Sequence, residues 1–126
     1  MRFRKDEELE IVLEGILKSH AQSLIYLYLL RNGKAKAEDI IRGTKLHPST
    51  VRESLSKMHA RGLISRVKLK NDSIGKNPYL YHPLPVIQLL KIYTMEMEEK
   101  FNRLISLTSN SLVHLKIEVS DREDES

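Results

Sequence analysis

The stretch Lys45–Ser65, KLHPSTVRESLSKMHARGLIS, predicts one short helix whose start and end can both be read from the sequence. Pro48 suits the first helical turn, where a missing N–H group costs no hydrogen bond. Gly62 suits the position just past the end of the helix, where the backbone must be left-handed. Three apolar side chains between them recur at i, i+4 and i+7 and form one narrow stripe: Val51, Leu55 and Met58.

The opposite face of this helix is short, polar and able to form hydrogen bonds. At about 100° per residue, four residues point away from the apolar stripe and two lie on the flanks. The four are Ser49, Glu53, Ser56 and Lys57, and the two are Thr50 and Arg52. Such a face suits the edges of bases in a DNA major groove. An ordinary amphipathic surface helix has the same pattern, so the neighbouring segments must decide.

The segments before this helix are also helical by their apolar spacing, over residues 6–17, 20–31 and 37–43. Ser19 and Gln22 match the capping box, in which Ser19 caps the second helix and Gln22 reaches back. That helix is apolar nearly all round and is expected at the centre of the core. Asn32-Gly33 ends it, and Gly43-Thr44-Lys45 forms a turn. A short helix, a tight turn with glycine and a second helix make a helix-turn-helix.

The segment after the helix predicts a β-hairpin. Residues 63–70 alternate, so we expect a half-buried strand with Val67 and Leu69 on its inner face. Its outer face carries a row of three cations: Arg66, Lys68 and Lys70. A turn-rich loop follows, and residues 78–82 form the second strand. A hairpin in this position is the wing of a winged helix, and its cations suit a phosphate backbone or a minor groove. A hairpin that only caps the core is the alternative.

The charge of the chain is concentrated in its middle. The 126 residues carry a net charge of +4, but residues 31–76 hold twelve basic and four acidic residues, a net charge of +8. Residues 1–30 have a net charge of −1 and residues 77–126 a net charge of −3. A basic middle third between mildly acidic ends indicates a localised surface for a polyanion.

The C-terminal part predicts one long helix over residues 85–117, followed by a charged, disordered tail over 118–126. Its apolar residues recur in steps of three and four, close to 3.67 residues per turn. They are Leu90, Tyr93, Met97, Phe101, Leu104, Leu112 and Leu115. A helix projecting beyond a small domain cannot bury such a stripe alone, so we expect it to pair with a second copy of the chain. A helix folded back on its own domain is the alternative.

The run from Ser19 to Pro85 resembles the winged-helix domain of archaeal TrmB-like regulators, and more loosely the MarR and ArsR groups. The resemblance is carried by QSLIYLYLLRNGKAKAEDI, HPSTVRESLSKMHARGLISR and NPYLYHPLP. It implies that the helix from Pro48 enters the major groove through Ser49, Thr50, Arg52, Glu53 and Ser56. It also implies a wing that uses Arg66, Lys68 and Lys76. Larger TrmB-like proteins carry a C-terminal sugar-binding domain, and no stretch here is long enough for one.

Other functional classes find little support in the sequence. The chain has no cysteine, no glycine-rich phosphate loop and no pair of carboxylates with an obvious base, so we expect no enzyme and no cofactor. The five histidines are dispersed, and we expect no metal site, although His82 or His114 could be ligands in a site shared across a dimer. No stretch is apolar enough to span a membrane or act as a signal peptide. The absence of cysteine agrees with a reducing cytoplasm, where we expect the protein.

We therefore expect a mainly α protein with a small β-hairpin, in which residues 1–84 form a winged helix-turn-helix domain and the C-terminal helix forms a homodimer. Its expected partner is double-stranded DNA, as a transcriptional regulator. Two alternatives stay open. One is a winged helix that docks onto proteins of the transcription machinery, and the other is a repressor that senses a ligand between the long helix and the wing.

Overall fold

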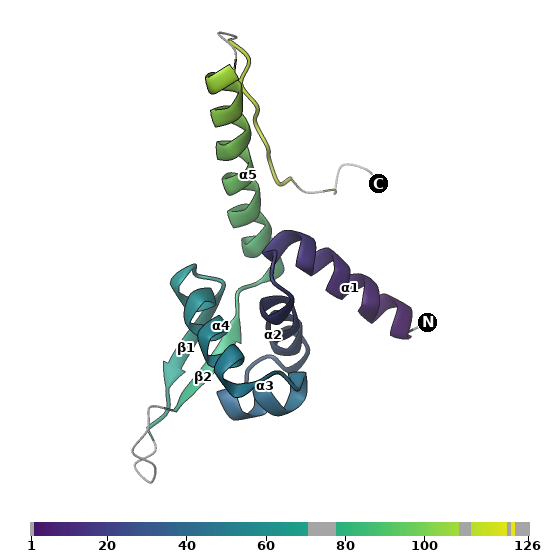
Figure 1. The fold of residues 1–126 in the computed structure, drawn as a ribbon, viewed down its shortest axis with the longest axis vertical. Helices are drawn as coiled ribbons and strands as arrows, with labels where there is room; N and C mark the ends of the chain where they lie inside the picture. The colour runs from purple at the N-terminus through teal and green to yellow at the C-terminus, as the bar shows by residue number, and fades with distance from the viewer. Residues whose placement is uncertain (1, 71–77, 109–111, 121, 123–126) are drawn as a thin grey trace. The chain divides into compact units, whose positions relative to one another are not determined.

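A computed structural model of the chain describes residues 2–70, 78–108, 112–120 and 122, with side chains from Lys5 onward. It divides into two units, Met1–Leu84 and Pro85–Ser126, and each is described by itself. The elements are α1 (Arg2–Leu17), α2 (His20–Asn32), α3 (Ala37–Thr44), α4 (Pro48–Ala60), β1 (Ile64–Lys68), β2 (Tyr79–Pro83) and α5 (Val86–Thr108). The predicted fold class is confirmed: the protein is mainly helical, with one small antiparallel hairpin (Figure 1).

Helix α2 is the centre of the first unit. It packs against α1, α3, α4 and β2, and its residues Ile25, Tyr26, Leu27 and Leu29 are buried. The Tyr26 hydroxyl donates a hydrogen bond to the carbonyl oxygen of Leu84, 2.5 Å away. Burial raises the pKa of Tyr26 above its ordinary value, because the phenolate would lose its hydration. The nearly all-apolar character of this segment therefore predicted its position correctly.

The start of α2 shows half of the predicted capping box. Ser19 is the N-cap, and its hydroxyl oxygen accepts a hydrogen bond from the backbone N–H of Gln22 at 3.1 Å. The reciprocal bond is not made, because Gln22 Oε1 is buried and has no hydrogen-bond partner among the described residues. The prediction that Gln22 reaches back is therefore wrong, and one cap bond is enough to begin this helix.

The turn between α3 and α4 uses its glycine in an unexpected way. Gly43 lies inside α3, where an added Cβ atom would overlap the ring of Tyr28, so the residue permits close packing of α3 on α2. The left-handed backbone conformation falls instead on Lys45, with φ of 61°. Gly33, with φ of 80°, ends α2 as predicted.

The hairpin pairs β1 with β2 in antiparallel register, with Arg66 opposite Tyr81 and Lys68 opposite Tyr79. Ala35 forms an isolated antiparallel bridge with the hairpin. Its N–H donates to the carbonyl oxygen of Tyr81 at 3.0 Å, and its carbonyl oxygen accepts from the N–H of Tyr81 at 2.8 Å. Strand β2 is as long as predicted, but β1 is shorter than the predicted residues 63–70, and its predicted inner face is not covered. Val67 is 57% exposed, and only Ile64 of β1 is buried. Leu69, just after β1, is half-buried as predicted, but Val67 is not, so the alternation marks a covered face only in part.

The second unit consists of α5 and a segment that runs back along it (Figure 1). The helix ends at Thr108, earlier than the predicted end at residue 117, and residues 112–120 are not helical. The side chain of Asn102 donates to the carbonyl oxygen of Leu115 at 2.9 Å and accepts from its N–H at 2.7 Å. The N–H of Ile117 donates to Glu98 at 2.8 Å. These bonds hold the returning backbone against one flank of α5.

Candidate nucleic-acid interface

Helix α4 is fixed in place by its inner face. Val51, Leu55 and Met58 are buried, which confirms the predicted apolar stripe, and Ser54 is buried beside them. The helix packs against α2, α3 and β1. With this face held on three sides, α4 cannot rotate about its axis without exposing the core. The orientation of its outer face is therefore set by the packing.

The outer face of α4 carries the predicted candidates. Five of them are exposed and Thr50 is half-buried; the exposed ones are Ser49, Arg52, Glu53, Ser56 and Lys57. Glu53 and Lys57 form an exposed ion pair at 3.8 Å, an i, i+4 contact that offsets part of the Lys57 charge. The structure thus brings all six α4 candidates to one accessible polar surface.

The N-terminus of α4 is capped by a residue that the sequence analysis missed. His47 is the N-cap, and its Nδ1 atom accepts a hydrogen bond from the backbone N–H of Ser49 at 3.2 Å. The same nitrogen lies 2.8 Å from the Ser49 hydroxyl. Pro48 occupies the first turn as predicted. Histidine is not among the common N-caps, so its position before the proline gave no clear signal.

The hairpin places two predicted cations in solvent and holds a third against a ring. Lys68 and Lys70 are exposed. The guanidinium carbon of Arg66 lies 4.2 Å from the centre of the Tyr79 ring, a cation–π contact that fixes the direction of this side chain. Tyr79 in turn lies against Tyr81, with ring centres 6.2 Å apart. The contact of Arg66 with Tyr79 depends on the register of the two strands, which the sequence does not reveal. Lys76 lies outside the described residues.

The residues predicted to form a dimer fall into two groups. On α5, Leu90, Tyr93 and Met97 are half-buried, while Phe101 is 40% exposed and Leu104 is 61% exposed. The other two, Leu112 and Leu115, do not continue the helical stripe, because they lie on the returning segment. The predicted stripe is therefore shorter and ends on α5 near Leu104.

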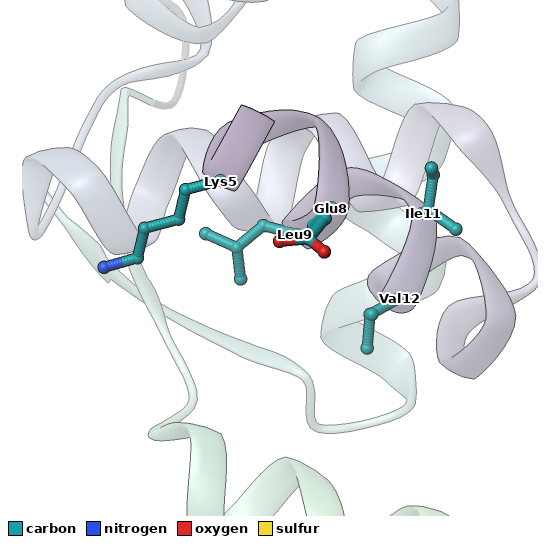
Figure 2. Close-up of a pocket in the computed structure, with 5 residues that line it drawn as sticks. All are labelled: Lys5, Glu8, Leu9, Ile11 and Val12. Atoms are coloured by element: carbon teal, nitrogen blue, oxygen red, sulfur yellow. The ribbon is translucent and has the colours of Figure 1, made fainter. Parts of the chain in front are cut away.

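An open pocket in the first unit is lined by one helix. Figure 2 shows its five side chains, all from α1: Lys5, Glu8, Leu9, Ile11 and Val12. Leu9, Ile11 and Val12 are exposed, while Leu13 and Leu17 of the same helix are buried. The inner side of α1 thus packs on α2, and an apolar strip remains accessible on its outer side.

Within residues 2–70, 78–108, 112–120 and 122, no group of three or more His, Cys, Asp or Glu side chains is placed to share a metal ion. None of the helices in these residues has the length and apolar character needed to cross a lipid bilayer.

Comparison with known proteins agrees with this geometry. A family model described as "Sugar-specific transcriptional regulator TrmB" matches residues 19–86. No curated protein with a similar sequence was found. A possible transcriptional regulator from Methanosarcina mazei Go1 has a similar structure, with a TM-score of 0.66 and 22% identity over 78% of this chain and 83% of that chain.

Two further solved structures share the fold. TrmBL2, described as an archaeal chromatin protein with a novel mode of DNA binding, has a TM-score of 0.66 and 14% identity, over 82% of this chain and 36% of that chain. The S. aureus MepR F27L mutant bound to an oligodeoxyribonucleotide has a TM-score of 0.51 and 18% identity, over 86% of this chain and 79% of that one. Because the family model spans more than half of the sequence, the chain belongs to the TrmB family of transcriptional regulators.

Proposed function

We propose that this regulator binds specific sequences of double-stranded DNA as a homodimer, with α4 in the major groove and the β1–β2 hairpin along the backbone or in the minor groove. The observation that carries the proposal is the outer face of α4. Its opposite side is buried, so the helix can present only its polar side, with Ser49, Arg52 and Ser56 exposed. Short polar side chains beside an arginine suit the donors and acceptors on base edges.

The surrounding charge supports a polyanionic partner. Arg52, Lys68 and Lys70 are exposed, and no carboxylate among the described residues forms an ion pair with any of them. Their positive charges are therefore available to phosphates. A phosphate that pairs with such a cation releases condensed counterions, which makes binding favourable at low salt.

A protein-docking role receives less support from the same surface. A docking face normally presents a contiguous exposed apolar patch. Helix α4 has no large exposed hydrophobic side chain, and β1 has a single one, Val67. One isolated valine beside several cations does not make such a patch.

The dimer is supported by the apolar stripe on α5. Met97, Phe101 and Leu104 follow at steps of four and three residues and so lie on one face of the helix. Phe101 and Leu104 remain substantially exposed in the single chain. Pairing with the α5 helix of a second copy would remove these side chains from water with a two-fold axis. The two copies of α4 would then meet a near-palindrome with half-sites about 10 base pairs apart.

The proposal is tested by the salt dependence of binding to double-stranded DNA. If about six phosphates are neutralised per dimer, the slope of log affinity against log salt should be about −5. Fluorescence anisotropy with a fragment selected from genomic DNA, between about 50 and 200 mM salt, measures this slope. An affinity that hardly changes over this range would contradict the proposal.

Matched variants separate the two kinds of contact. Lys68→Ala should weaken binding to selected and random DNA about equally, because a phosphate contact reads no sequence. Arg52→Ala should cost about 1–3 kcal/mol at one base position if it contacts a base edge. Lys100→Ala removes the same charge from an exposed position on α5 and is the control. Equal, sequence-blind losses for Arg52→Ala and Lys68→Ala would refute this division of roles.

A further inference from the structure

The contact between His47 and Ser49 determines where their protons lie. A backbone N–H group can only donate, and that of Ser49 donates to Nδ1 of His47 at 3.2 Å. Nδ1 therefore carries no proton, and in the neutral ring the proton is on Nε2. The Ser49 hydroxyl lies 2.8 Å from the same Nδ1 atom. The single lone pair of Nδ1 is then shared by two donors, the Ser49 N–H and, at the shorter distance, the Ser49 hydroxyl.

This hydrogen bond uses the only proton of the Ser49 hydroxyl. A serine hydroxyl has one donor and two acceptor lone pairs, so it normally can face either a donor or an acceptor. With its proton directed at His47, the oxygen offers only lone pairs to any other partner. Ser49 is exposed in the first turn of α4, on the outer face that we assign to the major groove.

An acceptor in the major groove discriminates between bases. Adenine and cytosine present amino groups there, N6 and N4, whereas thymine O4 and guanine O6 are acceptors. A hydroxyl that can only accept complements the amino groups and repels the carbonyl oxygens. A freely rotating hydroxyl would accommodate all four bases.

We propose that His47 is a positioning residue that restricts the Ser49 hydroxyl to accepting hydrogen bonds, so that the base it faces carries an amino group, adenine or cytosine. This inference rests on the proposed function, because it needs α4 in the major groove. It assigns a role in sequence specificity to a residue that need not touch DNA.

The test compares the DNA sequences selected from a random library by four chains: wild type, Ser49→Ala, His47→Gly and His47→Asn. Ser49→Ala identifies the base position, because the preference there should disappear. His47→Gly removes the acceptor, and glycine is tolerated at an N-cap with little loss of helix stability. His47→Asn is the conservative variant, because its side-chain oxygen can accept from the same backbone N–H group.

The wild-type chain should prefer adenine or cytosine over guanine or thymine at this position by about three- to ten-fold, the worth of one ordinary hydrogen bond. His47→Gly should reduce the preference to less than about two-fold, and His47→Asn should retain it. A circular dichroism spectrum checks that each variant is folded. In the wild-type chain, ¹⁵N NMR should find the His47 proton on Nε2, a result that does not depend on any variant or on DNA.

The possible failures are distinct. A wild-type chain that selects no DNA sequence would overturn the proposed function and this inference with it. A wild-type chain that selects DNA while His47→Gly keeps the same preference would overturn the inference alone. Loss of the preference in both His47 variants would point to direct contact of the ring with DNA and would also overturn it. So would a His47 proton on Nδ1, or a Ser49→Ala variant whose selected sequences are unchanged.

Discussion

Leu104→Glu should dissociate the proposed dimer, and the size of the effect follows from the exposure of the side chain. Complete burial of a leucine is worth about 1.5–3 kcal/mol. Leu104 is 61% exposed in the single chain, and burying this exposed part on pairing would be worth about 1–2 kcal/mol. A two-fold axis brings two copies to the interface, which doubles the loss to about 2–4 kcal/mol. The dimer should weaken by roughly 30- to 700-fold, and a charged carboxylate at the interface adds to this.

Sedimentation equilibrium at micromolar concentration measures the change directly. The matched control is Met95→Glu, which adds the same charge to α5 at a side chain that is 69% exposed. At about 100° per residue, Met95 lies on the opposite side of the helix from Leu104, so its replacement should leave the dimer intact. An intact protein that is monomeric, a Leu104→Glu variant that dimerises normally or an equal effect of both variants would refute the reasoning.

Three further predictions concern the stability of the fold. Gly43→Ala should destabilise the protein by about 1–3 kcal/mol in urea unfolding, because its Cβ would overlap the Tyr28 ring; an unchanged midpoint would contradict the packing described. Tyr26→Phe should cost about 0.5–1.5 kcal/mol at pH 7 through the lost bond to Leu84. Burial raises the pKa of Tyr26, so the stabilisation by its hydroxyl is complete below pH ~10 and is lost as the pH rises through the raised pKa. The wild-type chain and Tyr26→Phe should therefore converge in stability in urea titrations at alkaline pH. Stability curves that stay parallel would argue against this linkage. Asn102→Ala should speed amide hydrogen exchange at Leu115 by about 10- to 100-fold, since two hydrogen bonds are removed. Unchanged exchange would show that these two bonds do not hold the returning segment against α5.

The sequence predicted the parts of the fold that local chemistry controls. Pro48 and the left-handed Gly62, with φ of 78°, mark α4 because a helix start and a helix end make specific demands on the backbone. The apolar stripe of Val51, Leu55 and Met58 is buried because a period near 3.6 residues can serve only one packed face. The outer face of α4 follows from these same observations, and so do its candidate residues.

The errors lie where distant parts of the chain decide the outcome. Leu112 and Leu115 keep helical spacing, but a backbone that returns along α5 can keep the same spacing, and the bonds to Asn102 and Glu98 are visible only in three dimensions. Val67 alternates like a buried residue, although β1 extends beyond the core that would cover it. His47 was missed because its cap depends on the orientation of a side chain and not on a common residue type.

The returning segment also has a consequence for the proposed pairing of α5. A helix with two open apolar flanks can join two neighbours at once, and contacts of that kind propagate into larger bundles or filaments. On α5 the flank of Glu98 and Asn102 is already occupied by the backbone of residues 115 and 117. A second neighbour would have to displace this segment before it could settle there. If α5 pairs with a second copy as proposed, this segment therefore restricts the pairing along α5 to two chains.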